Sequence, residues 1–156
     1  MAGPVAATSA TAADPASSPR INVPALIANL EFLDTKPALV GHPLLIEFWA
    51  TWCPPCRASI AHLNELERKY HGRGLGIVGI TGEDQATVER FRAGTPMDYP
   101  VALDTGQAVA AEFQVETIPQ AWLLDSSGRV IWSGHPMQLD EQTIALALTT
   151  RPASGV

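Results

Sequence analysis

The stretch LLIEFWATWCPPC, residues 44–56, decides the fold. It opens with an almost continuous apolar run, which is typical of a central strand covered on both faces. The two prolines favour a helix start, because the N–H that proline lacks has no partner in the first helical turn. Apolar residues then recur at helical spacing as far as Tyr70, where glycines end the pattern. The stretch predicts a strand that leads through a short turn into a helix, with Cys53 at the junction.

The chain has two cysteines, Cys53 and Cys56. A structural disulfide stabilises a fold chiefly by closing a long loop, and this loop is about the shortest that can form. A structural zinc site commonly needs two such pairs, but the second pair is missing and the histidines show no ligand spacing. The pair therefore predicts redox chemistry.

Further along the chain, apolar runs alternate with segments of helical periodicity. The turn at residues 125–129 joins two apolar runs and predicts an antiparallel hairpin. This order predicts an α/β fold, a mixed sheet with helices on both faces. The expected elements are strands over 75–80, 121–124 and 130–132, an extended segment over 99–103, and helices over 84–92, over 105–113 and after Asp140 as N-cap.

The first part of the chain divides into two segments. Residues 1–20 are rich in Ala, Ser, Thr and Pro and predict a flexible leader, without the basic and apolar regions of an intact signal peptide. We expect the domain to occupy residues 21–156, opening with a short helix or an extended edge within 21–43. The leader is interpreted as a spacer behind a signal or membrane anchor, with a cytosolic tail as the alternative.

Composition excludes several classes of function. The 156 residues suit one domain, and 16 acidic against 10 basic side chains give a formal net charge of −6. Nucleic-acid binding depends on Lys and Arg that neutralise phosphates, so this charge argues against it. No stretch approaches the roughly 20 apolar residues of a membrane span.

The predicted position of the cysteines gives each one a role. Helix N-terminal N–H groups favour negative charge, so we expect Cys53 to have a lowered pKa and to act as the attacking thiolate. Cys56 lies one turn further into the helix and should be more buried, from where it would resolve a mixed disulfide. The cysteine pair carries the electrons, so no bound cofactor and no metal are expected.

Two motifs carry a family resemblance. The segment FWATWCPPC, residues 48–56, resembles the active-site segment of thioredoxin-like proteins, and its Ala-Thr-Trp-Cys-x-Pro-Cys form is similar to the TlpA/ResA branch of extracytoplasmic thiol–disulfide oxidoreductases. Thr117-Ile118-Pro119 resembles the second hallmark of these proteins, a Thr-x-Pro with a cis proline facing the cysteines. Residues 82–83 and 99–104 resemble the segment inserted in that branch.

The resemblance implies a thioredoxin-like fold and the reduction of protein disulfides. It places the Ile118 backbone beside Cys53, where an extended substrate strand could pair with it. The residues that it assigns to substrate binding are Trp52, Pro54, Pro55, Thr117, Ile118 and Pro119.

Two carboxylates are candidate proton carriers. Glu47 interrupts the central strand where thioredoxins carry a buried acid, so the resemblance implies that it exchanges a proton with Cys56. Its alternative is a side chain that reaches solvent or pairs with a base such as Lys36. Glu83 matches an acid that lies beside the active site in ResA-like proteins, and its alternative is a solvated residue in the first turn of a helix.

The resemblance also implies partners and a compartment. We expect protein substrates, an upstream electron donor, a monomer, a membrane tether in the full-length protein, and a periplasmic or extracytoplasmic location, with a cytoplasmic one as the alternative. The same resemblance implies that the protein acts in cytochrome c maturation or keeps a copper-site protein reduced. A disulfide-forming oxidase and a copper-binding metallochaperone are the rival functions, because the same cysteines could serve either.

Overall fold

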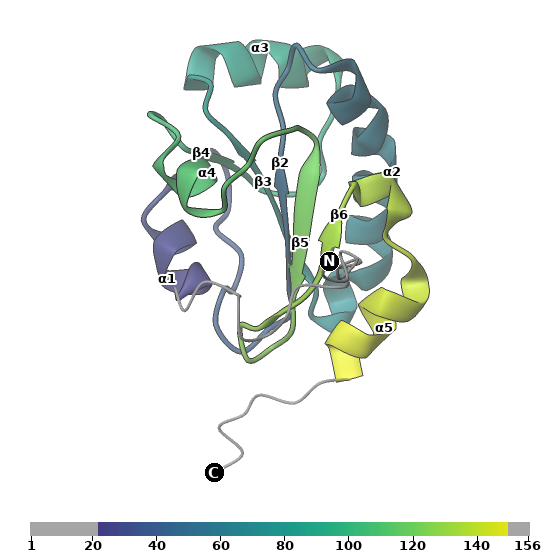
Figure 1. Cartoon of the computed structure of the whole chain (residues 1–156). Coiled ribbons are helices and arrows are strands. Elements are labelled where there is room, and N and C mark those ends of the chain that lie inside the picture. The colour runs from purple at the N-terminus through teal and green to yellow at the C-terminus, as the bar shows by residue number, and fades with distance from the viewer. Residues whose placement is uncertain (1–21, 150–156) are drawn as a thin grey trace, which may run out of the picture.

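The computed structural model describes residues 22–149, which build a mixed sheet with helices packed on it (Figure 1). The strands lie in the spatial order β1-β4-β3-β2-β5-β6. Their bounds are β1 Glu31–Phe32, β2 Leu44–Phe48, β3 Gly76–Thr81, β4 Val101–Leu103, β5 Gln120–Leu124 and β6 Val130–Gly134. The helices are α1 Val23–Ala28, α2 Pro54–Tyr70, α3 Gln85–Gly94, α4 Ala108–Glu112 and α5 Glu141–Thr149, with short 3-10 turns η1 His71–Arg73 and η2 Pro136–Gln138.

Strand β2 is the centre of the sheet, and every residue in it is buried. It pairs in parallel with β3 and antiparallel with β5, while β6 extends the hairpin on β5 as the sequence predicts. A strand with neighbours on both edges and helices on both faces meets no water, which explains its continuous apolar sequence.

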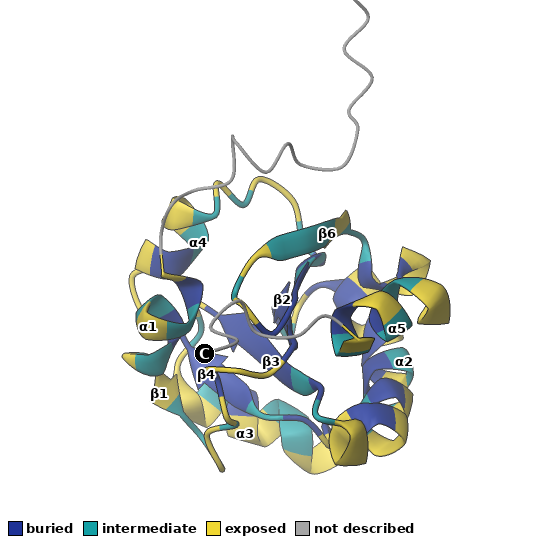
Figure 2. Ribbon diagram, turned by 90° about the horizontal axis from the view of Figure 1, so that it is seen from below, coloured by how far each residue is buried: buried dark blue, intermediate teal, exposed yellow. Residues whose placement is uncertain are grey.

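The side chains of β2 alternate between two cores, as the period of a strand requires. Leu45 points into the core beneath α2, α3 and α5, whereas Leu44 and Ile46 point into the core beneath α1 and α4. Figure 1 shows α2 and α5 on one side of the sheet and α1 and α4 on the other, and Figure 2 shows buried strands between helices with exposed outer surfaces. The predicted α/β architecture, a thioredoxin-like mixed sheet with helices on both faces, is confirmed.

One predicted helix is shorter than expected. The helix expected over 105–113 begins only at Ala108, because Gly106 and Gln107 have left-handed φ angles of 84° and 59°. The carboxylate of Asp104 reaches past this turn and accepts the backbone N–H groups of Val109 and Ala110 at 3.1 and 2.9 Å. Residues 105–107 therefore form a tight turn instead of the first turn of the helix, and Asp104 at the start of this turn caps α4.

The opening segment contains both alternatives that the sequence left open, helix α1 and the edge strand β1. The predicted leader, residues 1–20, lies outside the described residues. No helix within residues 22–149 is long and apolar enough to cross a membrane.

Candidate functional site

The two cysteines form a disulfide at the start of α2. Cys53 is the N-cap, and the Cys56 N–H donates a hydrogen bond to the Cys53 sulfur, with nitrogen and sulfur 3.2 Å apart. Cys56 is fully buried and Cys53 is 3% exposed, so the expected order of burial holds. The unpaired N–H groups and the dipole of the helix start both favour negative charge on Cys53 once the disulfide is reduced.

A cis peptide bond joins Ile118 to Pro119, opposite the cysteines. The carbonyl oxygen of Ile118 lies 3.8 Å from the Cys53 sulfur. The register explains this proximity, because β2 and β5 pair antiparallel with Phe48 beside Gln120. The residue before Gln120 therefore comes alongside the loop that follows β2. Thr117 in the same segment is exposed and Ile118 is half-buried.

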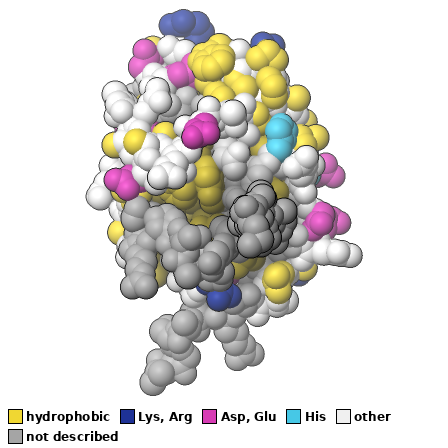
Figure 3. All heavy atoms as spheres, viewed as in Figure 1, with side chains coloured by type: hydrophobic (Ala, Val, Ile, Leu, Met, Phe, Trp, Pro, Cys, Tyr) yellow, Lys and Arg dark blue, Asp and Glu magenta, His cyan; other side chains and the backbone are white. Residues whose placement is uncertain are grey.

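The surface around the disulfide is apolar. Trp52 is 70% exposed, which is unusual for so large an apolar side chain, and Pro54 and Pro55 are exposed beside it. Figure 3 shows hydrophobic side chains gathered at the end of the molecule where α2 begins in Figure 1. Exposed apolar groups of this kind mark a surface to which another protein can dock.

Glu83 is bonded to the loop that carries the cysteines. Its carboxylate accepts the Thr51 N–H at 2.8 Å, the Thr51 hydroxyl at 2.6 Å and the Thr81 hydroxyl at 2.9 Å. The pairing is possible because β2 and β3 are parallel, so the segments after both strands meet at one edge of the sheet. Helix α3 begins at Gln85 with Asp84 as its N-cap, so the alternative of a solvated residue in the first turn was wrong for Glu83.

Glu47 is buried, with 1% of its surface exposed. It lies between Ile46 and Phe48, which face the α1/α4 core, so it faces the side of the sheet that holds Cys56. Neither carboxylate oxygen has a hydrogen-bond partner among residues 22–149, and burial raises the pKa of this carboxyl well above its usual value. Lys36 donates instead to the Ala28 carbonyl, so both alternatives, solvent contact and a pair with Lys36, were wrong.

A cavity of about 280 Å³ opens beside the cysteines, between the cis-proline segment and Glu83. Its wall includes Trp52, Glu83, Asp104, Glu116 and Ile118, and no basic side chain of the described chain lines it. Within residues 22–149 no group of three His, Cys, Asp or Glu side chains could hold a metal ion.

Sequence reasoning missed two residues that lie beside Glu47. The sequence gives Trp49 no role beyond the FWATWCPPC motif and Tyr99 only a place in the extended segment, yet both are buried with unpartnered polar atoms in the described chain. One signal was available, because Gly79 sits inside an apolar strand, where glycine often marks a close approach of other groups.

A mixed sheet, a disulfide at a helix start and a cis proline facing it define a thioredoxin-fold protein with a dithiol–disulfide site. The sequence model of the Redoxin family matches residues 12–146. The chain belongs to the Redoxin family.

Known relatives and structures agree with this membership. The chain is similar to "Thiol-disulfide oxidoreductase ResA" of Bacillus thuringiensis strain Al Hakam, 32% identical over 94 residues, which cover 60% of this chain and 54% of the relative. The protein of the same name from Bacillus thuringiensis subsp. konkukian is 31% identical over 103 residues, 65% of this chain and 60% of its own length. The chain thus spans between half and two thirds of these relatives.

Two crystal structures show the same fold. A thiol:disulfide interchange protein of the thioredoxin family from Chlorobium tepidum TLS superposes with a TM-score of 0.60 at 27% identity, over 69% of this chain and 81% of that one. StoA from Bacillus subtilis superposes with a TM-score of 0.56 at 24% identity, over 62% of this chain and 75% of that one.

Proposed function

We propose that this chain is a thiol–disulfide oxidoreductase that reduces disulfide bonds of other proteins. One observation carries the proposal: the Cys53–Cys56 disulfide lies at the start of α2, where the Cys56 N–H is aimed at the Cys53 sulfur. The names of the ResA relatives and of the Chlorobium tepidum protein support thiol–disulfide exchange as the class of reaction.

The reaction transfers two electrons from the dithiol to the substrate. In the reduced enzyme the Cys53 thiolate attacks one sulfur of a substrate disulfide, and the other substrate sulfur leaves as a thiolate and takes up a proton. Cys56 then loses its proton and attacks the Cys53 sulfur, so the Cys53–Cys56 bond forms and the second substrate sulfur departs. An upstream dithiol donor must reduce the enzyme again.

The two acids have different tasks in this proposal. Glu47 lies on the face of the sheet that holds Cys56 and takes the proton that Cys56 gives up. Glu83 does not touch the sulfurs but holds the Thr51 N–H and hydroxyl, so it positions the loop that leads to Cys53. Glu83 is therefore a positioning residue.

A substrate protein would dock on the apolar surface beside the disulfide. Trp52, Pro54 and Pro55 offer contact area, and the Thr117-Ile118-Pro119 segment offers backbone groups to an extended substrate strand. The Ile118 carbonyl, 3.8 Å from the Cys53 sulfur, would hold that strand in line for attack.

The chain works as a monomer on protein substrates, in the periplasm or another extracytoplasmic compartment and tethered to a membrane there, without a metal or bound cofactor.

The direction of exchange is tested by the reduction potential of the Cys53–Cys56 couple, measured by equilibrium with glutathione and followed by tryptophan fluorescence. A reductase should give about −250 mV or lower, on the scale where thioredoxin lies at about −270 mV. A value near −120 mV overturns the reductase assignment and makes the protein a disulfide-forming oxidase.

The rival function, a copper-binding metallochaperone, would be supported by a tight copper complex that survives in glutathione.

The two cysteine roles are tested by a matched pair of variants. With a disulfide-bonded protein substrate, Cys56→Ser should accumulate a covalent mixed disulfide, whereas Cys53→Ser should form none, as resolved by non-reducing electrophoresis and mass spectrometry. Trapping through Cys56 in the Cys53→Ser variant would reverse the assigned order of attack.

A further inference from the structure

A cluster of unpartnered polar atoms lies in the interior beneath α2. Glu47 Oε1 and Oε2, Trp49 Nε1 and the Tyr99 hydroxyl are all buried, and none has a hydrogen-bond partner among residues 22–149. Glu47, Trp49 and Tyr99 are exposed by only 1%, 3% and 1%. Buried polar atoms are normally paired, since an unpaired one costs a desolvation penalty, so a cluster of them points to a function.

Gly79 brings the three side chains together. It pairs with Glu47 across β2 and β3, and its N–H donates to the Pro100 carbonyl at 2.9 Å, which holds the segment of Tyr99 against the strand. A Cβ at this position would lie 2.9 Å from Trp49 Nε1 and 3.1 Å from Tyr99 Cε2. The missing side chain therefore leaves the space that the indole and the phenol ring occupy beside Glu47.

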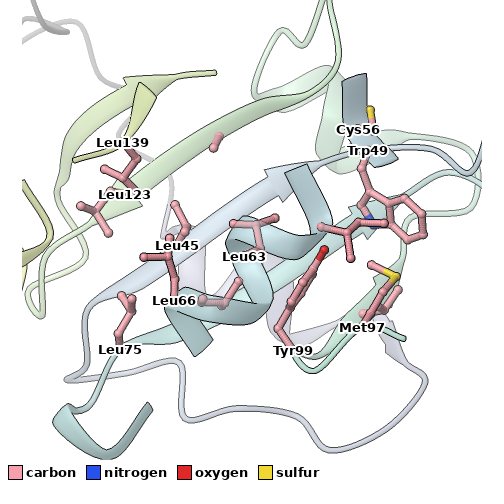
Figure 4. Packing of buried hydrophobic residues seen from close by; sticks show 14 of the residues in the cluster. Leu45, Trp49, Cys56, Leu63, Leu66, Leu75, Met97, Tyr99, Leu123 and Leu139 are labelled. Atoms are coloured by element: carbon pink, nitrogen blue, oxygen red, sulfur yellow. The ribbon is translucent and has the colours of Figure 1, made fainter. Parts of the chain in front are cut away.

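The two rings supply hydrogen-bond donors and the carboxylate supplies acceptors. Figure 4 shows the hydroxyl end of Tyr99 pointing toward the indole of Trp49, beneath the helix that carries Cys56. The phenol O–H and the indole N–H are donors, and an ionised Glu47 is an acceptor only. Two donors and one carboxylate complement each other, either directly or through one bridging water.

We propose that Tyr99 is a positioning residue for Glu47. Its hydroxyl hydrogen-bonds the ionised carboxylate of Glu47, with Trp49 as the second donor, and these bonds govern proton transfer from Cys56 to Glu47. The inference rests on the proposed function, which makes Glu47 the proton acceptor. Among residues 22–149 the Tyr99 hydroxyl has no hydrogen bond to either sulfur, so in this proposal it acts through Glu47.

The charged groups around Tyr99 leave Glu47 as its principal polar neighbour. Burial raises the pKa of the Tyr99 hydroxyl most, followed by the charge of Glu47 and then by Asp98. Tyr99 also lines a cavity of about 700 Å³ on the edge of the core. The titratable and charged groups that share the lining of this cavity are Asp34, His42, Glu67, His71, Arg92 and Asp98.

Most of these outer groups are in ion pairs, and Asp98 pairs with Arg68 at 2.7 Å. Arg92 pairs with Asp34 at 2.8 Å and His71 with Glu67 at 3.1 Å. For Glu67 burial raises the pKa, and His71 acts in the opposite direction. None of them contributes to the raised pKa of Glu47, which burial alone causes. Removing the Tyr99 hydroxyl should therefore act on Glu47 without disturbing a second charge network.

The first test titrates the Glu47 carboxyl directly, by infrared difference spectroscopy of its C=O stretch in the oxidised protein. A hydrogen bond to the charged form lowers the pKa of an acid, so Tyr99→Phe should move the midpoint of this band upward by about one pH unit. Glu47→Gln assigns the band by removing it. Tyr70→Phe is the matched control, because the Tyr70 hydroxyl bonds Glu141 at 3.0 Å, and it should leave the midpoint unchanged.

The second test follows single-turnover resolution of the mixed disulfide against pH in the same variants. Tyr99→Phe should displace the profile to higher pH by about one unit in the wild-type background and should change nothing in a Glu47→Gln background. An unchanged infrared midpoint in Tyr99→Phe, or an equal displacement in both backgrounds, would overturn the inference.

Failure of the proposed function would look different. In that case the wild-type protein forms no mixed disulfide, although Tyr99→Phe still moves the infrared band. That outcome would overturn the link to Cys56 together with the proposed function, whereas an active wild type with an unmoved band would overturn only the role of Tyr99. Urea unfolding of each variant shows that the fold is retained, since phenylalanine keeps the ring of Tyr99 in place.

Discussion

Thr51 ties the cysteine loop to the neighbouring strand through a single carboxylate. Both its N–H and its hydroxyl donate to Glu83, and the hydroxyl bond is short at 2.6 Å, as hydrogen bonds to charged acceptors are. Thr51→Val keeps the shape and the backbone bond but removes the hydroxyl bond. The free energy of unfolding should fall by about 1–2 kcal/mol, measured by urea denaturation of the oxidised protein.

Thr105→Val is the control for that measurement. Thr105 is exposed in the turn before α4, so its replacement should change stability by less than about 0.5 kcal/mol. Equal effects of the two substitutions would mean that the bond from the Thr51 hydroxyl to Glu83 adds nothing to stability.

At the scale of single elements, α4 depends on a cap outside its own sequence. It has only 5 residues, too few for an isolated helix, and its N-cap Gln107 makes no side-chain capping bond. Asp104 is 3% exposed and supplies both bonds, one from each carboxylate oxygen. Asp104→Ala should cost about 2–3 kcal/mol, and Asp104→Asn, which keeps one acceptor oxygen, should cost less.

Hydrogen exchange of the α4 backbone checks this directly. The amides of Val109 and Ala110 should exchange faster in Asp104→Ala than in the wild type, while amides in β2 should change only with global stability. If the two substitutions cost the same and the α4 amides are unaffected, Asp104 is not the cap.

The elements that the sequence predicts well are those with a strong local pattern. The β2 to α2 transition follows from an apolar run, two prolines and helical periodicity, all within residues 44–70. The start of α4 could not be predicted in this way. Its apolar residues at helical spacing, Val109 and Phe113, do not mark where the helix begins, and the left-handed conformation of Gln107 depends on the turn that Asp104 caps.

The residues of the site also fall into those that a local pattern predicts and those that depend on long-range contacts. Cys53, Cys56 and the Thr117-Ile118-Pro119 segment are recognised as motifs, and Glu47 stands out as an acid in an apolar strand. The bond between Thr51 and Glu83 and the cluster of Glu47 with Tyr99 depend on the pairing of β2, β3 and β4. No local pattern encodes these contacts, because strand order is decided by the packing of the whole sheet.

At the scale of the whole molecule, a carboxylate in the central strand makes stability depend on pH. Burial raises the folded-state pKa of Glu47 above its value in the unfolded chain, so between the two pKa values the folded protein binds more protons. Stability is therefore unaffected by Glu47 below the unfolded pKa and falls as pH rises toward the folded pKa. The slope is at most about 1.4 kcal/mol per pH unit.

Glu47→Gln removes this titration, so its stability should decline less than that of the wild type as pH rises from the ordinary glutamate range. Urea unfolding of the oxidised protein at a series of pH values measures the difference, and oxidation keeps the cysteines from titrating. The buried amide of the variant adds a constant offset, so the slope and not the absolute value carries the result. Glu112→Gln, in an exposed side chain of α4, should give a curve parallel to the wild type. A parallel curve for Glu47→Gln as well would mean that burial does not raise the pKa of Glu47 in the folded protein, and that Glu47 is not the buried proton acceptor of Cys56.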